Sequence, residues 1–181
     1  MKIIDAVKLM QTGDVFVVQG KGIVSEVIEA VTDSEFSHAA IFYRDGAVNM
    51  VAEENERDGA GGNALNAGFQ TLPLNIWITQ QSGPIYWGQS EDVVRNHPTK
   101  TLELIEFYKT HEQSQHYGFL SLIPIAISHL TNIDIPILSW SEVCSTLVAE
   151  ILSADGETDV KSAATPGDIA ANAVKLTLLE V

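Results

Sequence analysis

Apolar and polar positions alternate along this chain in a way that predicts short strands mixed with helices. Runs of strand length and composition occupy residues 15–19, 37–44, 47–53, 72–78, 84–88 and 174–181. Helical spacing of apolar residues occupies 2–11, 23–31, 99–111, 119–130 and 140–153, and a last short helix or turn begins within 165–170. These elements predict an α+β fold, with a small antiparallel sheet or partial barrel and helices packed on its faces.

A hairpin is the clearest local feature of this pattern. The dipeptide at 45–46, Asp-Gly, lies between two apolar runs, and Asp-Gly is a strong signal for a two-residue turn. With that turn, Arg44 pairs with Ala47, and the numbers of facing residues sum to 91. His38 then lies directly opposite Glu53, at a separation that suits an imidazole–carboxylate hydrogen bond.

Such a pair has a chemical use, because a carboxylate fixes the tautomer of an imidazole and stabilises its protonated form. Glu54 is expected to point to the other face, and a bulge or a three-residue turn would exchange it with Glu53. An incidental surface pair is the alternative. The small residues at 39–40, both alanine, favour a functional pair because they leave room beside His38.

Cys144 is the only cysteine in the chain, and it lies near the expected start of the helix at 140–153. Ser139 and Glu142 have the spacing of a capping box, and Ser141 is an equally good cap. Either cap leaves the thiol close to the positive end of the helix, which stabilises a thiolate. A lone cysteine is otherwise most often a small buried hydrophobe.

Composition narrows the possible functions. The 181 residues suit one domain and are 45% apolar, and a single cysteine excludes an intrachain disulfide. A net charge of −14 disfavours nucleic acid and anionic membranes as partners. Neither a signal peptide nor a transmembrane segment is indicated, so the expected location is cytoplasmic, with phage-encoded or other delivery as an alternative.

Five segments in this order resemble the circularly permuted papain-like proteins of the NlpC/P60 superfamily, specifically the YiiX-like type. They are Gly13–Phe16, Asp33–Ile41, Glu53, Val143–Val148 and Thr165–Ala170. In that family a strand histidine and an acidic or polar residue come first, and the cysteine comes last on a helix. The resemblance implies a single domain over 1–181, with the cysteine helix packed against the sheet.

The resemblance also implies a site, with Cys144 as the nucleophile, His38 as the general base and Glu53 as the residue that orients His38. The chemistry it implies is hydrolysis of an amide bond through an acyl-thioester on Cys144, with the Cys144 backbone N–H as an oxyanion donor. The expected substrate is a small peptide, a cell-wall fragment or an acylated amine, and no cofactor or metal is expected. The oligomeric state stays open.

Two segments look elaborated relative to the family, and the second of them motivates another function for the same cleft. A glycine-rich loop spans 55–70, and the apolar segment at 119–130 is able to host a lipid chain. A non-catalytic binding module for an acyl chain or peptide is therefore an alternative, and a thiol acyltransferase is another.

Other chemistry-bearing residues are weaker candidates. His111 and His116 are five residues apart, which on a helix places them on different faces and disfavours a shared zinc ion. Trp77 and Trp87 are expected to be core residues. Asp14, which follows a glycine turn, is expected to act as a cap.

Overall fold

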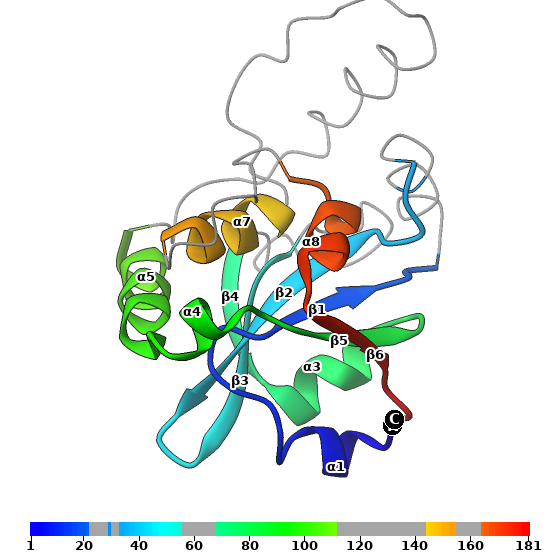
Figure 1. The fold of residues 1–181 in the computed structure, drawn as a ribbon, viewed down its shortest axis with the longest axis horizontal. Coiled ribbons are helices and arrows are strands. Elements are labelled where there is room, and N and C mark those ends of the chain that lie inside the picture. Colours follow the sequence, from blue (N-terminus) through cyan, green and yellow to red (C-terminus); the bar gives the residue numbers. More distant parts are fainter. Residues whose placement is uncertain (22–28, 30–32, 56–67, 112–143, 155–163) are drawn as a thin grey trace, which may run out of the picture.

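The computed structural model describes residues 1–21, 29, 33–55, 68–111, 144–154 and 164–181. These residues form an α+β fold around one six-stranded sheet in which all neighbouring strands are antiparallel (Figure 1). In spatial order the strands are β4 (Gly68–Pro73), β3 (Val48–Asn55), β2 (His38–Asp45), β1 (Val15–Val18), β5 (Ile85–Gln89) and β6 (Lys175–Leu178). The α+β prediction is confirmed, and the sheet is open.

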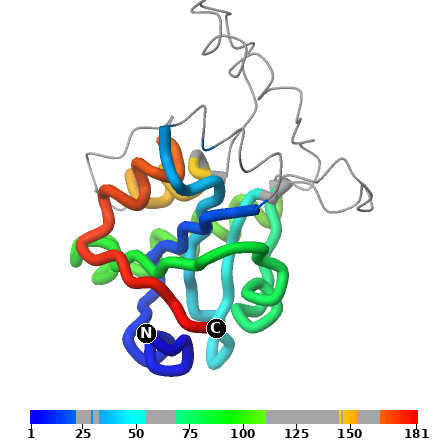
Figure 2. The backbone as a smooth tube through the Cα atoms, turned by 90° about the vertical axis from the view of Figure 1, so that its right-hand side faces the viewer, coloured from blue at the N-terminus to red at the C-terminus, as the bar shows by residue number. Residues whose placement is uncertain are grey.

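Helices cover both faces of this sheet. One face, called the α3 face below, carries α1 (Ile3–Ala6) and α3 (Leu74–Gln80). The other, the α7 face, carries α4 (Asp92–Arg95), α5 (Pro98–His111), α7 (Cys144–Ala154) and α8 (Pro166–Asn172). The two chain ends lie together (Figure 2), where the Met1 amino group donates to the Leu178 carbonyl at 2.8 Å.

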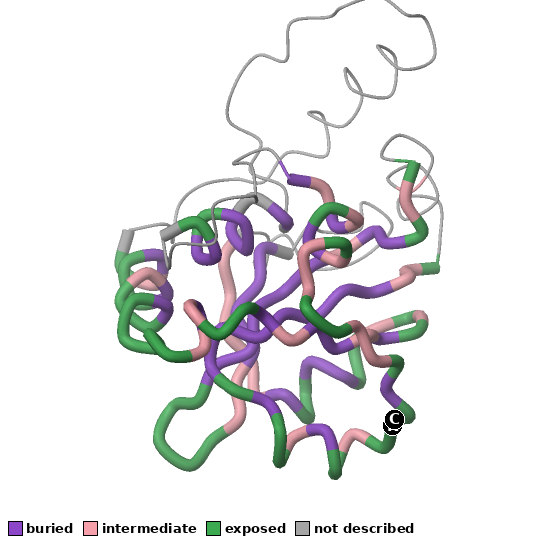
Figure 3. Tube along the Cα trace, viewed as in Figure 1, coloured by how far each residue is buried: buried purple, intermediate pink, exposed green. Residues whose placement is uncertain are grey.

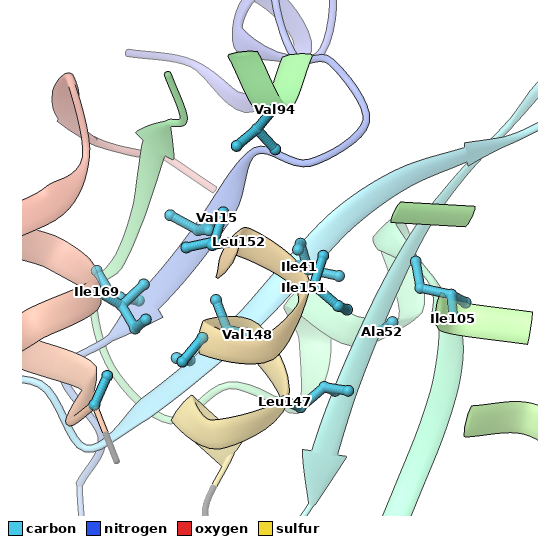
Figure 4. Packing of buried hydrophobic residues seen from close by; sticks show 14 of the residues in the cluster. Val15, Ile41, Ala52, Val94, Ile105, Leu147, Val148, Ile151, Leu152 and Ile169 are labelled. Atoms are coloured by element: carbon cyan, nitrogen blue, oxygen red, sulfur yellow. The ribbon is translucent and has the colours of Figure 1, made fainter. Parts of the chain in front are cut away.

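Side chains of the central strands alternate between two buried clusters. In β1, Val15 and Val17 point to the α7 face, whereas Phe16 and Val18 point to the α3 face. Because helices cover both sides, the central strands are apolar at nearly every position, and the middle of the sheet is buried (Figure 3). On the α7 face, side chains of α7 pack directly onto the strands (Figure 4).

The predicted strand at 72–78 is wrong in its second half. β4 ends at Pro73, and the following residues form α3. The physical reason is Pro73, which lacks the N–H needed to continue a ladder and has a fixed φ that suits the residue just before a helix. Trp77 is therefore carried by a helix on the α3 face.

The helix predicted over 2–11 is also shorter than expected, since only Ile3–Ala6 is helical. Lys2 at its N-cap makes no capping hydrogen bond, so the first turn lacks the stabilisation that a cap supplies. The Arg44 guanidinium also donates hydrogen bonds to the carbonyls of Val7 and Met10, at 3.0 and 3.1 Å.

Other predicted helices are confirmed where the structure describes them. The helix over 99–111 is α5, and the segment at 165–170 opens α8 with a capping box between Thr165 and Asp168. The helix predicted over 140–153 is α7 from Cys144 onward. Residues 140–143, the segment 119–130, most of 23–31 and residues 56–67 lie outside the described residues. The loop predicted over 55–70 is wrong at both ends, because Asn55 belongs to β3 and Gly68 starts β4.

Gly13 offers a test of how the first turn is packed. Its φ is +96°, and a Cβ there would lie 2.6 Å from Cγ1 of Val94. We expect Gly13→Ala to lower the free energy of unfolding by about 2–4 kcal/mol, because backbone strain and overpacking add.

Gly46→Ala is the matched control, measured by the same chemical denaturation. Gly46 also has a positive φ, of +58°, but no atom lies within 4 Å of the added Cβ. It should therefore cost about 1–2 kcal/mol, from strain alone. Equal losses of stability in the two variants would show that a Cβ added at residue 13 does not clash with Val94.

Candidate active site

His38 and Glu53 form a buried hydrogen-bonded pair. Nε2 of His38 lies 2.6 Å from Oε2 of Glu53. His38 is the first residue of β2 and keeps 20% of its side chain exposed, whereas Glu53 keeps 3%. A partly exposed imidazole is thus hydrogen-bonded to a buried carboxylate.

The hairpin register that led to this pair differs from the prediction. Asp45 pairs with Val48, so that facing numbers sum to 93, and the two turn residues are Gly46 and Ala47. Only Gly46 of the two has a positive φ, the arrangement of a type II′ turn, which spares Asp45 a left-handed conformation.

A shift of two residues leaves every side chain on its predicted face, because strand side chains alternate with a period of two. Continuing the observed register past Ile41 places Ala40 opposite Glu53. His38 is then the diagonal neighbour of Glu53 on the α3 face, within reach of two long side chains. The predicted contact is present, by a diagonal geometry that was not predicted.

Two further side chains bind the Glu53 carboxylate. Gln70 Nε2 on β4 donates to Oε1 at 2.6 Å, and Trp77 Nε1 on α3 donates to Oε2 at 2.5 Å. Trp77 is a core residue, as predicted, but its polar contact was not foreseen. The sequence carries no signal for it, because the contact depends on where α3 packs.

These contacts decide the charge of Glu53. Burial raises the pKa of its carboxyl, but the positive charge of His38 and the hydrogen bonds from His38, Trp77 and Gln70 outweigh burial. The pKa of Glu53 is therefore lowered from its ordinary value of 4.5. Glu53 is a carboxylate at neutral pH.

This shift predicts how stability changes with pH. A group whose pKa is lower in the folded state stabilises the fold above the unfolded pKa, and that contribution is lost as pH falls through the folded pKa. Wild-type stability should therefore decline below about pH 4.5 in part through Glu53.

Denaturant titrations of wild type and Glu53→Gln across this range measure the contribution. The stability difference between the two proteins should be largest near neutral pH and shrink as the solution is acidified. A difference that grows on acidification would mean that Glu53 is protonated at neutral pH.

The pairing also assigns the two ring nitrogens of His38. A carboxylate only accepts hydrogen bonds, so Nε2 carries the proton that is shared with Glu53. In the neutral ring Nδ1 then holds the lone pair. Nδ1 is therefore the ring nitrogen that is able to accept a proton.

Cys144 is the first residue of α7, and its side chain lies outside the described part of the chain. The body of α7 packs on the α7 face, whereas His38 and Glu53 belong to the α3 face. The N-terminal end of α7, just before Leu147, lies at the end of the sheet where β2 begins and β3 ends (Figure 4). The first residue of β2 is His38, so the start of the helix and the His38 pair share one end of the sheet.

Glu54 is as buried as Glu53, at 3% exposed, but it points to the other face of β3. Of these two carboxylates, Glu53 contacts His38 through a resolved hydrogen bond. The geometry thus favours Glu53 as the partner of His38, and Glu54 belongs to the α7 face.

Asp14 was expected to act as a cap, but it directly precedes β1 and is not the N-cap residue of any helix with a described N-cap. Its carboxylate accepts from the Gln11 backbone N–H at 2.9 Å and from Trp87 Nε1 at 3.0 Å, and it pairs with the Arg95 guanidinium at 3.0 Å. Asp14 is fully buried and ties β1 to β5 and α4.

The described residues contain neither a metal-binding group nor a membrane-spanning helix. None of the His, Cys, Asp and Glu residues there gather in threes or more as a metal ion requires. His97 is exposed and contacts the Val93 carbonyl through Nδ1 at 2.7 Å. In this part of the chain no helix has the length and apolar character to cross a bilayer.

Comparison with known proteins places the fold. No protein-family model matches the chain, and no curated protein matches its sequence. Among solved structures, the fold is similar to that of metalloprotein yiiX from Escherichia coli O157:H7, with a TM-score of 0.51 and 16% identity over 94% of this chain and 96% of that chain. The chain has a YiiX-like fold.

Proposed function

We propose that this chain is a thiol hydrolase of the permuted papain-like, NlpC/P60 type, which cleaves an amide bond through an acyl-thioester on Cys144. The observation that carries the proposal is the hydrogen bond between His38 and the buried, ionised Glu53. An imidazole held by a carboxylate is the base that a cysteine nucleophile needs. The start of α7 at the same end of the sheet supports Cys144 as that nucleophile.

In the first half of the proposed reaction, His38 Nδ1 takes the thiol proton, and the Cys144 sulfur attacks the substrate carbonyl carbon. A C–S bond forms, and the carbonyl electron pair moves to oxygen, where the backbone N–H of Cys144 stabilises the charge. The pair then returns and breaks the C–N bond. The amine leaves with the proton from His38, and an acyl-thioester remains.

In the second half, water replaces the amine. His38 Nδ1 takes a proton from the water, whose oxygen attacks the thioester carbonyl. Collapse of this intermediate breaks the C–S bond, releases the acid and returns the proton to the site as a thiolate–imidazolium pair. Glu53 stays a carboxylate throughout and stabilises the imidazolium at each step.

The neighbour in the fold comparison is named a metalloprotein, which raises the fit of a metal centre to the described residues. His38 and Glu53 are potential ligands, but Nε2 and Oε2 already bond to each other and Oε1 accepts from Gln70. Among the described residues no third acid, histidine or cysteine joins them in a metal-binding group. These residues do not fit a metal centre, and the proposed chemistry uses only side chains and a backbone N–H of this chain.

The proposal is tested by trapping the acyl-enzyme. p-Nitrophenyl acetate is the probe, because it transfers an acyl group to an activated thiolate whatever the natural substrate is. Intact-mass spectrometry of wild type should show rapid acetylation of Cys144, reversed by hydroxylamine as a thioester is.

Cys144→Ser and His38→Ala are the comparison proteins. We expect at least a hundredfold slower acetylation in both, the contribution of a positioned base or nucleophile. Acetylation of wild type at the rate of His38→Ala would refute the proposed hydrolase. A panel of N-acyl amines and short peptides then identifies the amide that wild type cleaves.

A further inference from the structure

We infer that Trp77 and Gln70 are positioning residues, which hold Glu53 as a carboxylate in one orientation so that its Oε2 faces His38. The inference deepens the proposed function and rests on it for its catalytic meaning. Both residues act through Glu53, and neither is assigned a contact with substrate.

The first support is that both Glu53 oxygens have donors from different elements. Oε1 accepts from Gln70 on β4, and Oε2 accepts from Trp77 on α3 and from His38 on β2. Three donors from three elements define the plane of the carboxylate. Rotation about its terminal bond would break all three contacts at once.

The second support is the chemistry of the Trp77 indole, whose N–H donates and never accepts. A protonated carboxyl must place its own hydrogen, and neither an indole N–H nor a protonated imidazole nitrogen can accept it. Gln70 alone could adapt, by turning its amide so that the oxygen faces Glu53. The arrangement therefore opposes protonation of Glu53.

The third support is that the indole has little freedom to move away. Trp77 is fully buried and its ring lies 5.0 Å from that of Phe16, centroid to centroid. It belongs to the α3-face cluster, and α3 starts directly after β4 ends at Pro73. The packing of Trp77 in the core therefore holds its indole N–H in place independently of Glu53.

The charged surroundings of Glu53 are simple in the described part of the chain. From β2 comes His38, whose charge lowers the pKa of Glu53, whereas α3 and β4 contribute the neutral donors Trp77 and Gln70. Removing one neutral donor therefore changes the titration of Glu53 without adding or removing a charge.

The experiment compares Trp77→Phe with Trp87→Phe. Trp87 is equally buried in the α3-face cluster, and its indole donates to the buried Asp14 at 3.0 Å. Both variants lose one indole hydrogen bond to a buried carboxylate and leave a similar void. Only Trp77 is linked to His38.

Two readouts are taken on each protein: the carbon-13 shift of the Glu53 carboxyl against pH, and the pH profile of Cys144 acetylation by p-nitrophenyl acetate. In Trp77→Phe we expect the pKa of Glu53 to rise and acetylation at mildly acidic pH to fall about tenfold, the effect of one hydrogen bond to an ionised group. In Trp87→Phe both should match wild type, although its melting temperature falls.

Gln70→Leu is a second variant, at a half-buried position on the edge strand β4. It should shift the Glu53 titration in the same direction as Trp77→Phe. If neither variant moves that titration while stability drops, Trp77 and Gln70 are only structural and the inference is wrong. If the titration moves but Cys144 is inert in wild type, the positioning stands and the proposed hydrolase falls.

Discussion

Replacing His38 by alanine is expected to convert Cys144 from a thiol that is mostly ionised at neutral pH into one that is only a few per cent ionised. The imidazolium of His38 and the start of α7 together stabilise the thiolate in the proposed site. Without the imidazolium, the pKa of Cys144 returns toward that of an ordinary thiol, and the thiolate population drops roughly tenfold or more. The ultraviolet absorbance of the thiolate, followed against pH, measures this directly.

The chain offers a clean background for this titration, since Cys144 is its only cysteine. His97→Ala is the matched control, because His97 is an exposed histidine whose ring contacts the Val93 carbonyl. It should leave the thiolate curve unchanged. Overlapping thiolate curves for wild type and His38→Ala would show that His38 does not affect the ionisation of Cys144, and would contradict its role as the base of the proposed site.

Glu53→Ala is expected to produce the largest loss of stability among substitutions in the site, about 3–5 kcal/mol. It removes one partner of a buried pair and leaves the N–H of Trp77 without an acceptor in a dry environment. Urea denaturation at neutral pH, where Glu53 is ionised, is the measurement.

Glu53→Gln separates the charge of the side chain from its shape. Glutamine keeps one acceptor oxygen for the indole but places an N–H₂ group toward the remaining donors, so we expect a smaller loss than for alanine. We also expect the thiolate population of Cys144 to fall, because a neutral amide stabilises an imidazolium less than a carboxylate does. If alanine and glutamine cost the same and both cost under about 1 kcal/mol, the network is not buried as described.

Much of this site was predictable because strand side chains alternate strictly. The contact between His38 and Glu53 required only that both lie on one face of a hairpin, and a register error of two residues preserves the face. Asp-Gly does not decide the turn by itself. Gly46 suits the second position of a type I′ turn, with Asp45 first, and equally the first position of a type II′ turn, with Ala47 second.

The donors around Glu53 could not be predicted because they come from long-range packing. Trp77 was expected in a strand, and Pro73 starts a helix there instead. Gln70 is carried by the edge strand β4, whose pairing with β3 places it opposite Glu53. No local pattern in the sequence encodes either contact with Glu53. Both contacts depend on how β4 pairs with β3 and how α3 packs on the sheet.

The most direct test of a joint site for Cys144 and His38 is the ring titration of His38, followed by nuclear magnetic resonance before and after Cys144 is blocked with iodoacetamide. Blocking replaces a thiolate by a neutral thioether, so the imidazolium loses its anionic partner. We expect the pKa of His38 to fall clearly on blocking. A His38 titration that is identical in the free and blocked proteins would contradict a thiolate–imidazolium pair between these two residues.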